Sequence, residues 1–280
     1  MTVTLSNVPV RELFGMPVAV VTLPQVLDLV DETIVSRGHL RIGVVNASKV
    51  VNMRRDPVLR HDVLTSHIIL ADGISVVWAS RILGQRLPER VTGIDLMSGM
   101  LERGSRRGYR VFCLGATEDV LERVVACIRR DYPGVQVVGH RNGYFTQNEE
   151  SAVAADIATA RPDILLVAMT SPKKEKFLAR WAEQLQIPIC HGVGGSFDVM
   201  ANKVERAPQV WQRLGLEWLY RVKQEPRRLW KRYLVTNTLF VLMVLETAVR
   251  QRLSAWDIAP EAGSSPHVPR TGDATDRPLN

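Results

Sequence analysis

The sequence predicts an α/β fold of Rossmann-like type, in which a mostly parallel sheet is flanked by helices. Short apolar segments alternate with helix-like segments of about ten to fifteen residues, which is the order expected of β-α-β units. The strand-like segments are apolar throughout, as expected for strands that are covered by helices on both faces. A chain of 280 residues, 46% of them hydrophobic, can bury such a core and is not a disordered chain.

The expected strands follow one another along the first 200 residues. They are residues 18–22, 40–45, 67–71, 109–115, 135–139, 163–168 and 187–190. The helices expected between them are residues 23–36, 50–59 (helical or turn-like), 74–83, 118–131, 149–160 and 177–185, chosen by the helical spacing of their apolar residues. Residues 1–10 show no clear pattern.

The character of the chain changes near residue 201, which suggests three parts. Residues 1–200 form the α/β domain, residues 201–256 a basic helical appendage, and residues 257–280 a disordered tail rich in Pro, Gly, Ser and Thr. Pro226 is expected in the first turn of a new helix. The apolar run 234–249 is interrupted by Asn237 and Glu246, short of the roughly 20 residues of a membrane span.

The basic segment favours a membrane surface as a partner. Much of the net charge of +7 lies between residues 221 and 232, where aromatic residues alternate with cations. Cationic helices with aromatic residues bind membrane interfaces. A solvated helix packed on the core and a nucleic-acid surface are the alternatives. The aromatic residues and the apolar run that follows argue against nucleic acid.

Other features point to the cytoplasm. No charged segment followed by an apolar one opens the chain, so export is not expected. Cys113, Cys127 and Cys190 are scattered in or beside apolar runs and predict reduced core residues.

Polar or glycine-rich loops follow several of the expected strands. Asp72 directly follows the strand 67–71, Asn46 follows the strand 40–45, and the loop Gly192–Ser196 follows the last strand. Ligands of open α/β sheets bind at this carboxyl edge, so these residues are expected to meet there. Asp72 is also well placed to cap the helix that follows it, which is a common role of aspartate.

Several nucleotide-site patterns are absent from the sequence. No G-x-G-x-x-G opens an early β-α-β unit, and no Walker A loop exists. The six histidines lack metal-ligand spacing, and no D-x-D pair offers a divalent ion to a diphosphate. A phosphorylated ligand would therefore need arginine, lysine or a helix terminus.

Taken together, the motifs resemble the WecG/TagA/CpsF family of bacterial glycosyltransferases over about residues 10–250. The segments that carry the resemblance are 71–81 (ADGISVVWASR), 88–93 (PERVTG), 163–168 with 171–176 (SPKKEK), 192–198 (GVGGSFD) and 206–226 (RAP to QEP). The resemblance implies inverting transfer of a hexose or N-acetylhexosamine, of N-acetylmannosamine type or glucose, from a UDP-sugar. It implies a polyprenyl-diphosphate-linked sugar as acceptor at the inner face of the plasma membrane, in cell-surface polysaccharide biosynthesis. No cofactor or metal is expected, and a homo-oligomer stays open.

The resemblance also assigns roles to residues. Asp72 matches the proposed general base, and Arg90 matches a position that could hold phosphate or sugar. The expected substrate-binding residues are Asn46, Gly73, Thr92, Lys174, Gly192, Gly194, Gly195, Ser196, Asp198, Arg221, Arg228 and Lys231.

Some positions depart from the family pattern. Val44 stands where Thr is common, Lys174 where Gln is usual, and Lys231 where Arg is frequent. These departures leave the donor sugar open. Two other functions are weighed against the transferase: a nucleotide-sugar epimerase or dehydrogenase, and a non-catalytic membrane-bound protein that binds a nucleotide-sugar.

Overall fold

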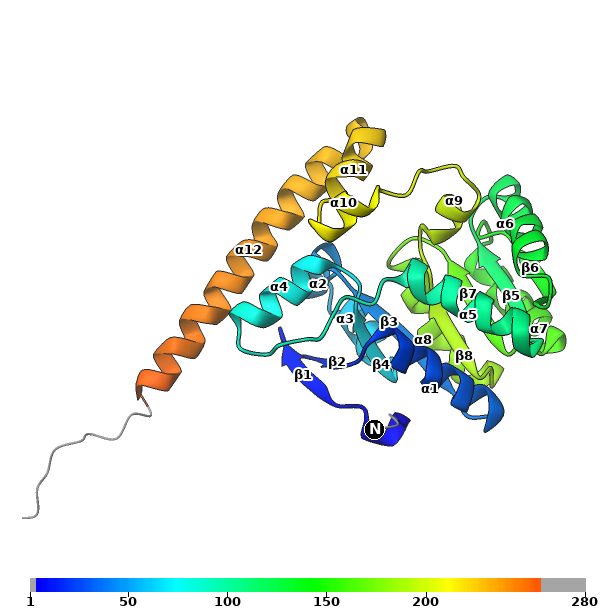
Figure 1. The fold of residues 1–280 in the computed structure, drawn as a ribbon, viewed down its shortest axis with the longest axis horizontal. Coiled ribbons are helices and arrows are strands. Elements are labelled where there is room, and N and C mark those ends of the chain that lie inside the picture. Colours follow the sequence, from blue (N-terminus) through cyan, green and yellow to red (C-terminus); the bar gives the residue numbers. More distant parts are fainter. Residues whose placement is uncertain (1–3, 258–280) are drawn as a thin grey trace, which may run out of the picture.

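A six-stranded parallel sheet forms the centre of the computed structural model, which describes residues 4–257 (Figure 1). The strand order is β4-β3-β8-β7-β5-β6, and each neighbouring pair is parallel. The strands are β3 (Leu40–Val45), β4 (Ile68–Ala71), β5 (Arg110–Gly115), β6 (Gln136–Arg141), β7 (Ile164–Ala168) and β8 (Ile189–Gly192). The predicted α/β fold with a mostly parallel sheet is confirmed.

Helices cover both faces of the sheet. They are α1 (Leu23–Val35), α2 (Ala47–Arg55), α3 (Pro57–Leu64), α4 (Ile74–Ile82), α5 (Gly93–Arg107), α6 (Glu118–Asp131), α7 (Glu150–Ala160), α8 (Lys173–Leu185), α9 (Ser196–Met200), α10 (Gln209–Arg213), α11 (Glu217–Gln224) and α12 (Pro226–Asp257). Successive strand residues alternate between the faces. Ile42 and Val44 pack with α1, α5, α6 and α9, whereas Val45 packs with α2, α4 and α12. This two-sided burial explains why the strands are apolar throughout.

Several elements of the structure were not predicted from the sequence, and an N-terminal hairpin is one of them. A hairpin of β1 (Val10–Leu13) and β2 (Met16–Ala19) precedes α1, so the strand expected at residues 18–22 was placed too late. Its two-residue turn, Phe14 and Gly15, has φ of 54° and 68°, a primed turn without the usual Asn-Gly signal.

Helix α5 was not predicted either. Its inward face follows helical spacing through Leu96, Met97, Met100 and Leu101. Asp95 lies in the first turn of this helix. Helix α8 also begins earlier than expected, at Lys173, so the lysines of the segment 171–176 lie in its first turn.

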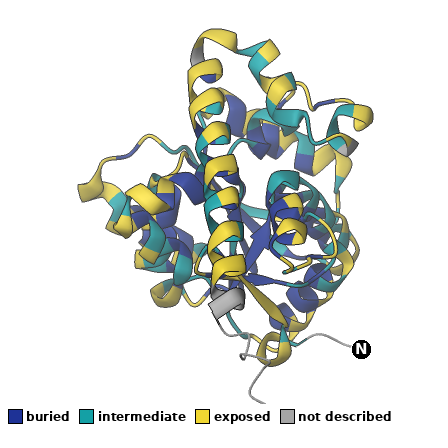
Figure 2. Cartoon of the chain, turned by 90° about the vertical axis from the view of Figure 1, so that its left-hand side faces the viewer, coloured by how far each residue is buried: buried dark blue, intermediate teal, exposed yellow. Residues whose placement is uncertain are grey.

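The C-terminal helix α12 is long and only partly buried. Phe240 and Val244 are 4% and 5% exposed in a core shared with α2 and the hairpin, while the outward face is exposed (Figure 2). By length and composition Leu229–Leu253 is apolar enough to cross a membrane, which is longer than the run read from the sequence. A soluble core helix passes the same test, so this is weak evidence of a span. The predicted tail lies outside the described residues beyond Asp257.

Candidate active site

Three neighbouring strands bring the predicted site residues to one edge. Asp72 follows β4, Asn46 follows β3, and Gly192 ends β8, and these strands are adjacent in the order β4-β3-β8. Adjacent strands lie about 4.8 Å apart, so Asp72 and the glycine loop are separated by about 10 Å. The sequence prediction that these residues share one sheet edge is confirmed.

Asp72 does not cap the helix that follows it. The N-cap of α4 is Gly73, and no side chain caps that helix. Instead Asp72 Oδ1 accepts a hydrogen bond of 2.9 Å from the backbone N–H of Gly93, the first residue of α5. A carboxylate at this position interacts favourably with the partial positive charge of the helix N-terminus.

Asn46 fixes the second oxygen of this carboxylate. Its Nδ2 donates to Asp72 Oδ2 at 3.4 Å, and its Oδ1 accepts from the N–H of Lys49 at 3.1 Å, which caps α2. Because this cap uses the amide oxygen of Asn46, its amide nitrogen faces Asp72, and the carboxylate accepts a hydrogen bond from it. Gly73 allows the approach, since a Cβ there would lie 3.1 Å from Asn46 Cβ.

Thr92 and Asp95 shape the start of α5. The Thr92 hydroxyl accepts from the N–H of Asp95 at 3.1 Å and donates to its carboxylate at 2.6 Å. Thr92 is 4% exposed, so it orders the helix start that holds Asp72.

The glycine loop lies between two cations from distant parts of the chain. A Cβ added to Gly192 would lie 3.1 Å from Cδ and Cε of Lys174, and one added to Gly194 would lie 3.9 Å from Lys174 Nζ. A Cβ added to Gly195 would lie 3.5 Å from Nη1 of Arg221, on α11. The contact at Gly192 is tighter than an ordinary van der Waals contact, so a glycine there lets the stem of Lys174 pass the loop.

Two further residues of the glycine loop region make local contacts. The Ser196 hydroxyl donates to the carbonyl of Val193 at 2.8 Å. Asp198 forms an ion pair of 3.7 Å with Lys203.

A buried charged cluster, Lys49–Glu175–Lys174, lies beside the loop. Lys49 Nζ and Lys174 Nζ both contact Glu175 Oε1, at 2.7 and 3.1 Å. All three side chains are nearly inaccessible, at 8%, 11% and 7% exposure for Lys49, Lys174 and Glu175. Burial, with the nearby charge of Lys174, lowers the pKa of Lys49 to about 8. Burial would raise the pKa of Glu175, but the two lysines hold it below its ordinary value.

His191, on β8, is a second buried group that the sequence did not single out. Its Nε2 lies 3.4 Å from the carbonyl oxygen of Gly93, and the residue is 0% exposed. Burial lowers the pKa of His191 to about 4, so its imidazole is neutral near pH 7. It therefore packs as a neutral ring beside Gly93, the residue whose N–H binds Asp72.

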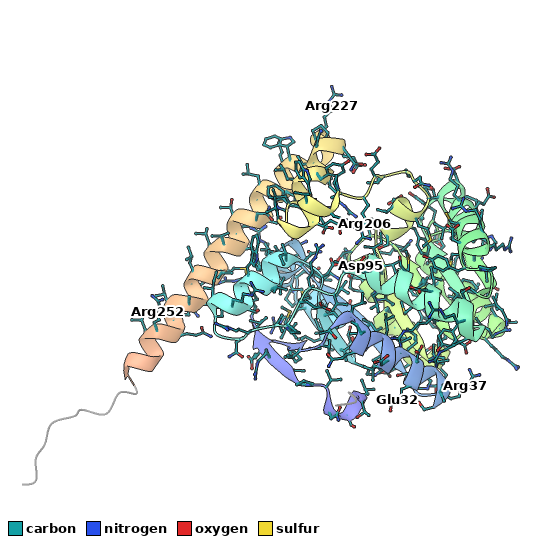
Figure 3. All side chains as sticks on the ribbon, in the orientation of Figure 1. Glu32, Arg37, Asp95, Arg206, Arg227 and Arg252 are labelled. Carbon is teal, nitrogen blue, oxygen red and sulfur yellow. The ribbon has the colours of Figure 1, made fainter. Side chains whose placement is uncertain are left out.

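The appendage is tied to the sheet edge by two ion pairs. Arg90 donates to Glu217 of α11 at 2.6 Å, and Arg206 pairs with Asp95 below the segment that joins α9 to α10 (Figure 3). Arg90 is thus held by a carboxylate of the appendage. The two pairs bring α11, and with it Arg221, toward the glycine loop.

Two predicted cations are not placed at the strand ends. Lys231 is exposed on α12, where its ammonium lies 5.5 Å from the centre of the Trp230 ring. Arg228 lies in the first turn of α12, and its side chain is outside the described part of the structure.

The strand ends bring together the cations Lys174 and Arg221 with the carboxylates of Asp72 and Glu175. Among residues 4–257 no group of three or more His, Cys, Asp or Glu side chains is arranged to hold a metal ion. The sequence assigned no role to Lys49, Glu175 or His191. A lysine or glutamate on a helix normally faces solvent, and His191 lies in a short apolar strand.

The sequence of this chain is similar to those of known glycosyl transferases. The model of the glycosyl transferase WecG/TagA/CpsF family matches residues 11–254. A Bacillus subtilis protein named N-acetylglucosaminyldiphosphoundecaprenol N-acetyl-beta-D-mannosaminyltransferase is 40% identical over 174 residues, 62% of this chain and 67% of the relative. A Bacillus spizizenii protein of the same name is 36% identical over 170 residues, 61% of this chain and 65% of the relative. The matched region thus spans about two thirds of these relatives' length.

Proposed function

The chain belongs to the WecG/TagA/CpsF family of glycosyl transferases, and on that premise we propose that it transfers an N-acetylhexosamine or hexose from a UDP-sugar to a polyprenyl-diphosphate-linked sugar. The observation that carries the proposal is the meeting of Asp72, held at the N-terminus of α5, with a glycine loop flanked by Lys174 and Arg221. A carboxylate and a cationic loop about 10 Å apart suit a displacement at the anomeric carbon, with the base beside the attacking hydroxyl on one face and the leaving diphosphate on the other.

In the proposed step Asp72 is the general base. Its Oδ1 is engaged by the N–H of Gly93 at 2.9 Å, whereas Oδ2 has only the long bond of 3.4 Å from Asn46. Oδ2 is therefore the oxygen that takes the proton from the acceptor hydroxyl. The hydroxyl oxygen bonds to the anomeric carbon as the bond from that carbon to the diphosphate breaks, and UDP leaves with the electron pair. Attack opposite to the leaving group inverts the anomeric configuration.

The departing diphosphate gains negative charge, which cations can stabilise in a site that excludes water. Lys174 and Arg221 lie against the glycine loop. Arg90 becomes available for the diphosphate if its ion pair with Glu217 breaks. Arg228 and Lys231 belong to the same proposed set, carried by the start of α12.

The acceptor is proposed from the relatives, whose names specify N-acetylglucosaminyl-diphospho-undecaprenol. Such a lipid lies in a membrane. The exposed apolar residues of α12, among them Leu242 and Leu245, and the basic start of that helix supply a surface that could lie on the membrane. We place the protein peripherally on the cytoplasmic face, where UDP-sugars occur.

One assay tests the proposal. The protein is incubated with UDP-N-acetylmannosamine and N-acetylglucosaminyl-diphospho-undecaprenol in a chelating buffer, and the lipid product is analysed by mass spectrometry and NMR. A lipid-linked disaccharide with inverted anomeric configuration is expected. UDP binding without transfer from any of a panel of UDP-sugars would instead indicate a non-catalytic binding protein. A nicotinamide requirement would indicate an epimerase or dehydrogenase.

A further inference from the structure

We propose that the buried Lys49–Glu175–Lys174 cluster is the anion-binding floor of the donor site, and that it binds the diphosphate of the UDP-sugar from beneath the glycine loop. The inference deepens the proposed function and depends on it for the identity of the ligand. It adds Lys49 and Glu175, to which the sequence assigned no role, to the residues that act on the leaving group.

The first argument is the place of the cluster. Lys49 is in the first turn of α2, and Lys174 and Glu175 are in the first turn of α8. The contacts between these side chains link the first turns of α2 and α8 beside Gly192, at the end of β8. Each helix N-terminus contributes partial positive charge, which favours a phosphate at such a place in α/β proteins.

The second argument is an excess of charge. Two lysines share a single oxygen of one glutamate, so the cluster carries +2 − 1 = +1 when all three groups are ionised. A buried charge that lacks a counter-ion is costly, so a cluster built for stability alone would hold one lysine, not two.

The third argument is access to the loop. The aliphatic stem of Lys174 passes Gly192, and its ammonium reaches the backbone at Gly194. Arg221 approaches the same loop at Gly195 from the appendage. A diphosphate on this loop would therefore meet a fixed, buried cation on one side and an exposed cation on the other.

The cluster also links binding to protons. Burial and the charge of Lys174 lower the pKa of Lys49 to about 8, while Glu175 and, more weakly, Asp72 raise it. Arg41 and Asp62 line the small cavity beside the cluster and complete the charged groups that face it. An added diphosphate favours the protonated lysine, so its pKa is higher in the complex than in the free protein. Binding near pH 8 then takes up a proton, and affinity falls as pH rises above about 8.

The experiment measures UDP and uridine binding to the full chain by calorimetry. The Lys174→Gln variant keeps length and polarity but removes the charge. The Lys176→Gln variant is the matched control, because Lys176 is on the same helix and is exposed. We expect Lys174→Gln to weaken UDP binding by about tenfold to a hundredfold, the usual effect of losing a charged hydrogen bond, and to leave uridine binding unchanged. The control should change UDP binding less than about threefold.

The melting temperature provides a second test, because the same variant should lose UDP affinity without losing stability. Removing Lys174 leaves Lys49 and Glu175 as a matched pair, so the Tm of the ligand-free Lys174→Gln variant should be unchanged or higher. A purely structural role predicts a lower Tm and no selective loss of UDP over uridine. The Lys49→Gln variant should in addition lose proton uptake on UDP binding, measured in buffers of different ionisation enthalpy at pH 8.

Two results would overturn the inference. One is UDP affinity that does not change in Lys174→Gln. The other is a loss confined to UDP-sugars that carry a carboxylate on the sugar, which would place the partner of Lys174 on the sugar. Both differ from failure of the proposed function, in which the wild type binds UDP with the predicted dependence on Lys174 but transfers no sugar.

Discussion

Replacing Asp72 with Asn tests the base directly, because the structure allows its two effects to be separated. The amide oxygen can still accept from the N–H of Gly93. The amide nitrogen then faces Nδ2 of Asn46, a donor against a donor. Asn46 cannot turn over freely, since its Oδ1 caps α2 through the N–H of Lys49.

The stability cost follows from these contacts. Loss of one long hydrogen bond costs about 1 kcal/mol. Loss of a carboxylate at a helix N-terminus adds about 0.3–1 kcal/mol. We therefore expect Asp72→Asn to fold, with a free energy of unfolding lower by about 1–2 kcal/mol, as measured by urea denaturation.

The catalytic cost is larger. Removal of a general base typically lowers the rate by about 10²–10⁴-fold, which is about 2.7–5.5 kcal/mol in the barrier. The assay is single-turnover transfer to the lipid-linked acceptor at saturating UDP-sugar. UDP affinity, measured in parallel, should change less than threefold, roughly 0.7 kcal/mol. Turnover within a factor of three of wild type would show that Asp72 only orders the start of α5.

Three further predictions concern the surroundings of the site and the fold. Arg221→Ala should weaken UDP binding about tenfold, as measured by calorimetry. The control is Arg227→Ala, which should not weaken it, because the side chain of Arg227 points away from the body of the protein in Figure 3. Equal effects of the two variants would refute a specific role of Arg221. Gly115→Ala should lower stability by at least about 2 kcal/mol, because φ is 120° and a Cβ would lie 2.4 Å from a backbone oxygen of β7; an unchanged Tm would contradict this geometry. Phe240→Ala should cost about 3–5 kcal/mol and Leu242→Ala, 55% exposed, less than about 0.5 kcal/mol; similar costs would mean that α12 is not packed as described.

The sheet edge was predictable from the sequence because strand ends are marked locally. An apolar run followed by Asp72-Gly73 or by the glycine loop fixes both the strand and the end at which the loop lies. The parallel order then brings Asp72 and Asn46 together without any knowledge of side-chain contacts.

Helix α5 and the N-terminal hairpin were not predictable by the same signals. Gly99 in α5 weakens the helical signal, yet a Cβ there would lie 2.7 Å from Leu27, so the glycine lets α1 pack closely. Phe14 adopts a positive φ in a turn that normally needs Asn or Gly. In both cases a tertiary requirement outweighs the local propensity.

The buried lysines were hidden for a related reason. Lys49 and Lys174 have the sequence context of solvated residues in the first turn of a helix. Only the convergence of α2 and α8 at the strand ends buries them together with Glu175. These buried charged residues can therefore be recognised as part of the site only once the order of the strands is known.

The appendage is less separable than its composition suggests. Phe240 and Val244 belong to the core formed with α2 and the hairpin, and Arg54 pairs with Glu246 at 2.8 Å. Truncation near residue 209 would expose this core, so a loss of activity in a truncated chain would combine lost stability with lost cations. The division into parts at residue 200 stays a prediction.

The most direct measurement is single-turnover sugar transfer near neutral pH in a chelating buffer, compared between wild type and Asp72→Asn. The variant should transfer sugar at least about a hundredfold more slowly than wild type while still binding UDP. A variant that transfers sugar at the wild-type rate, or a wild type that transfers no sugar from any UDP-sugar to the lipid-linked acceptor, would contradict a carboxylate base acting opposite a cationic diphosphate site.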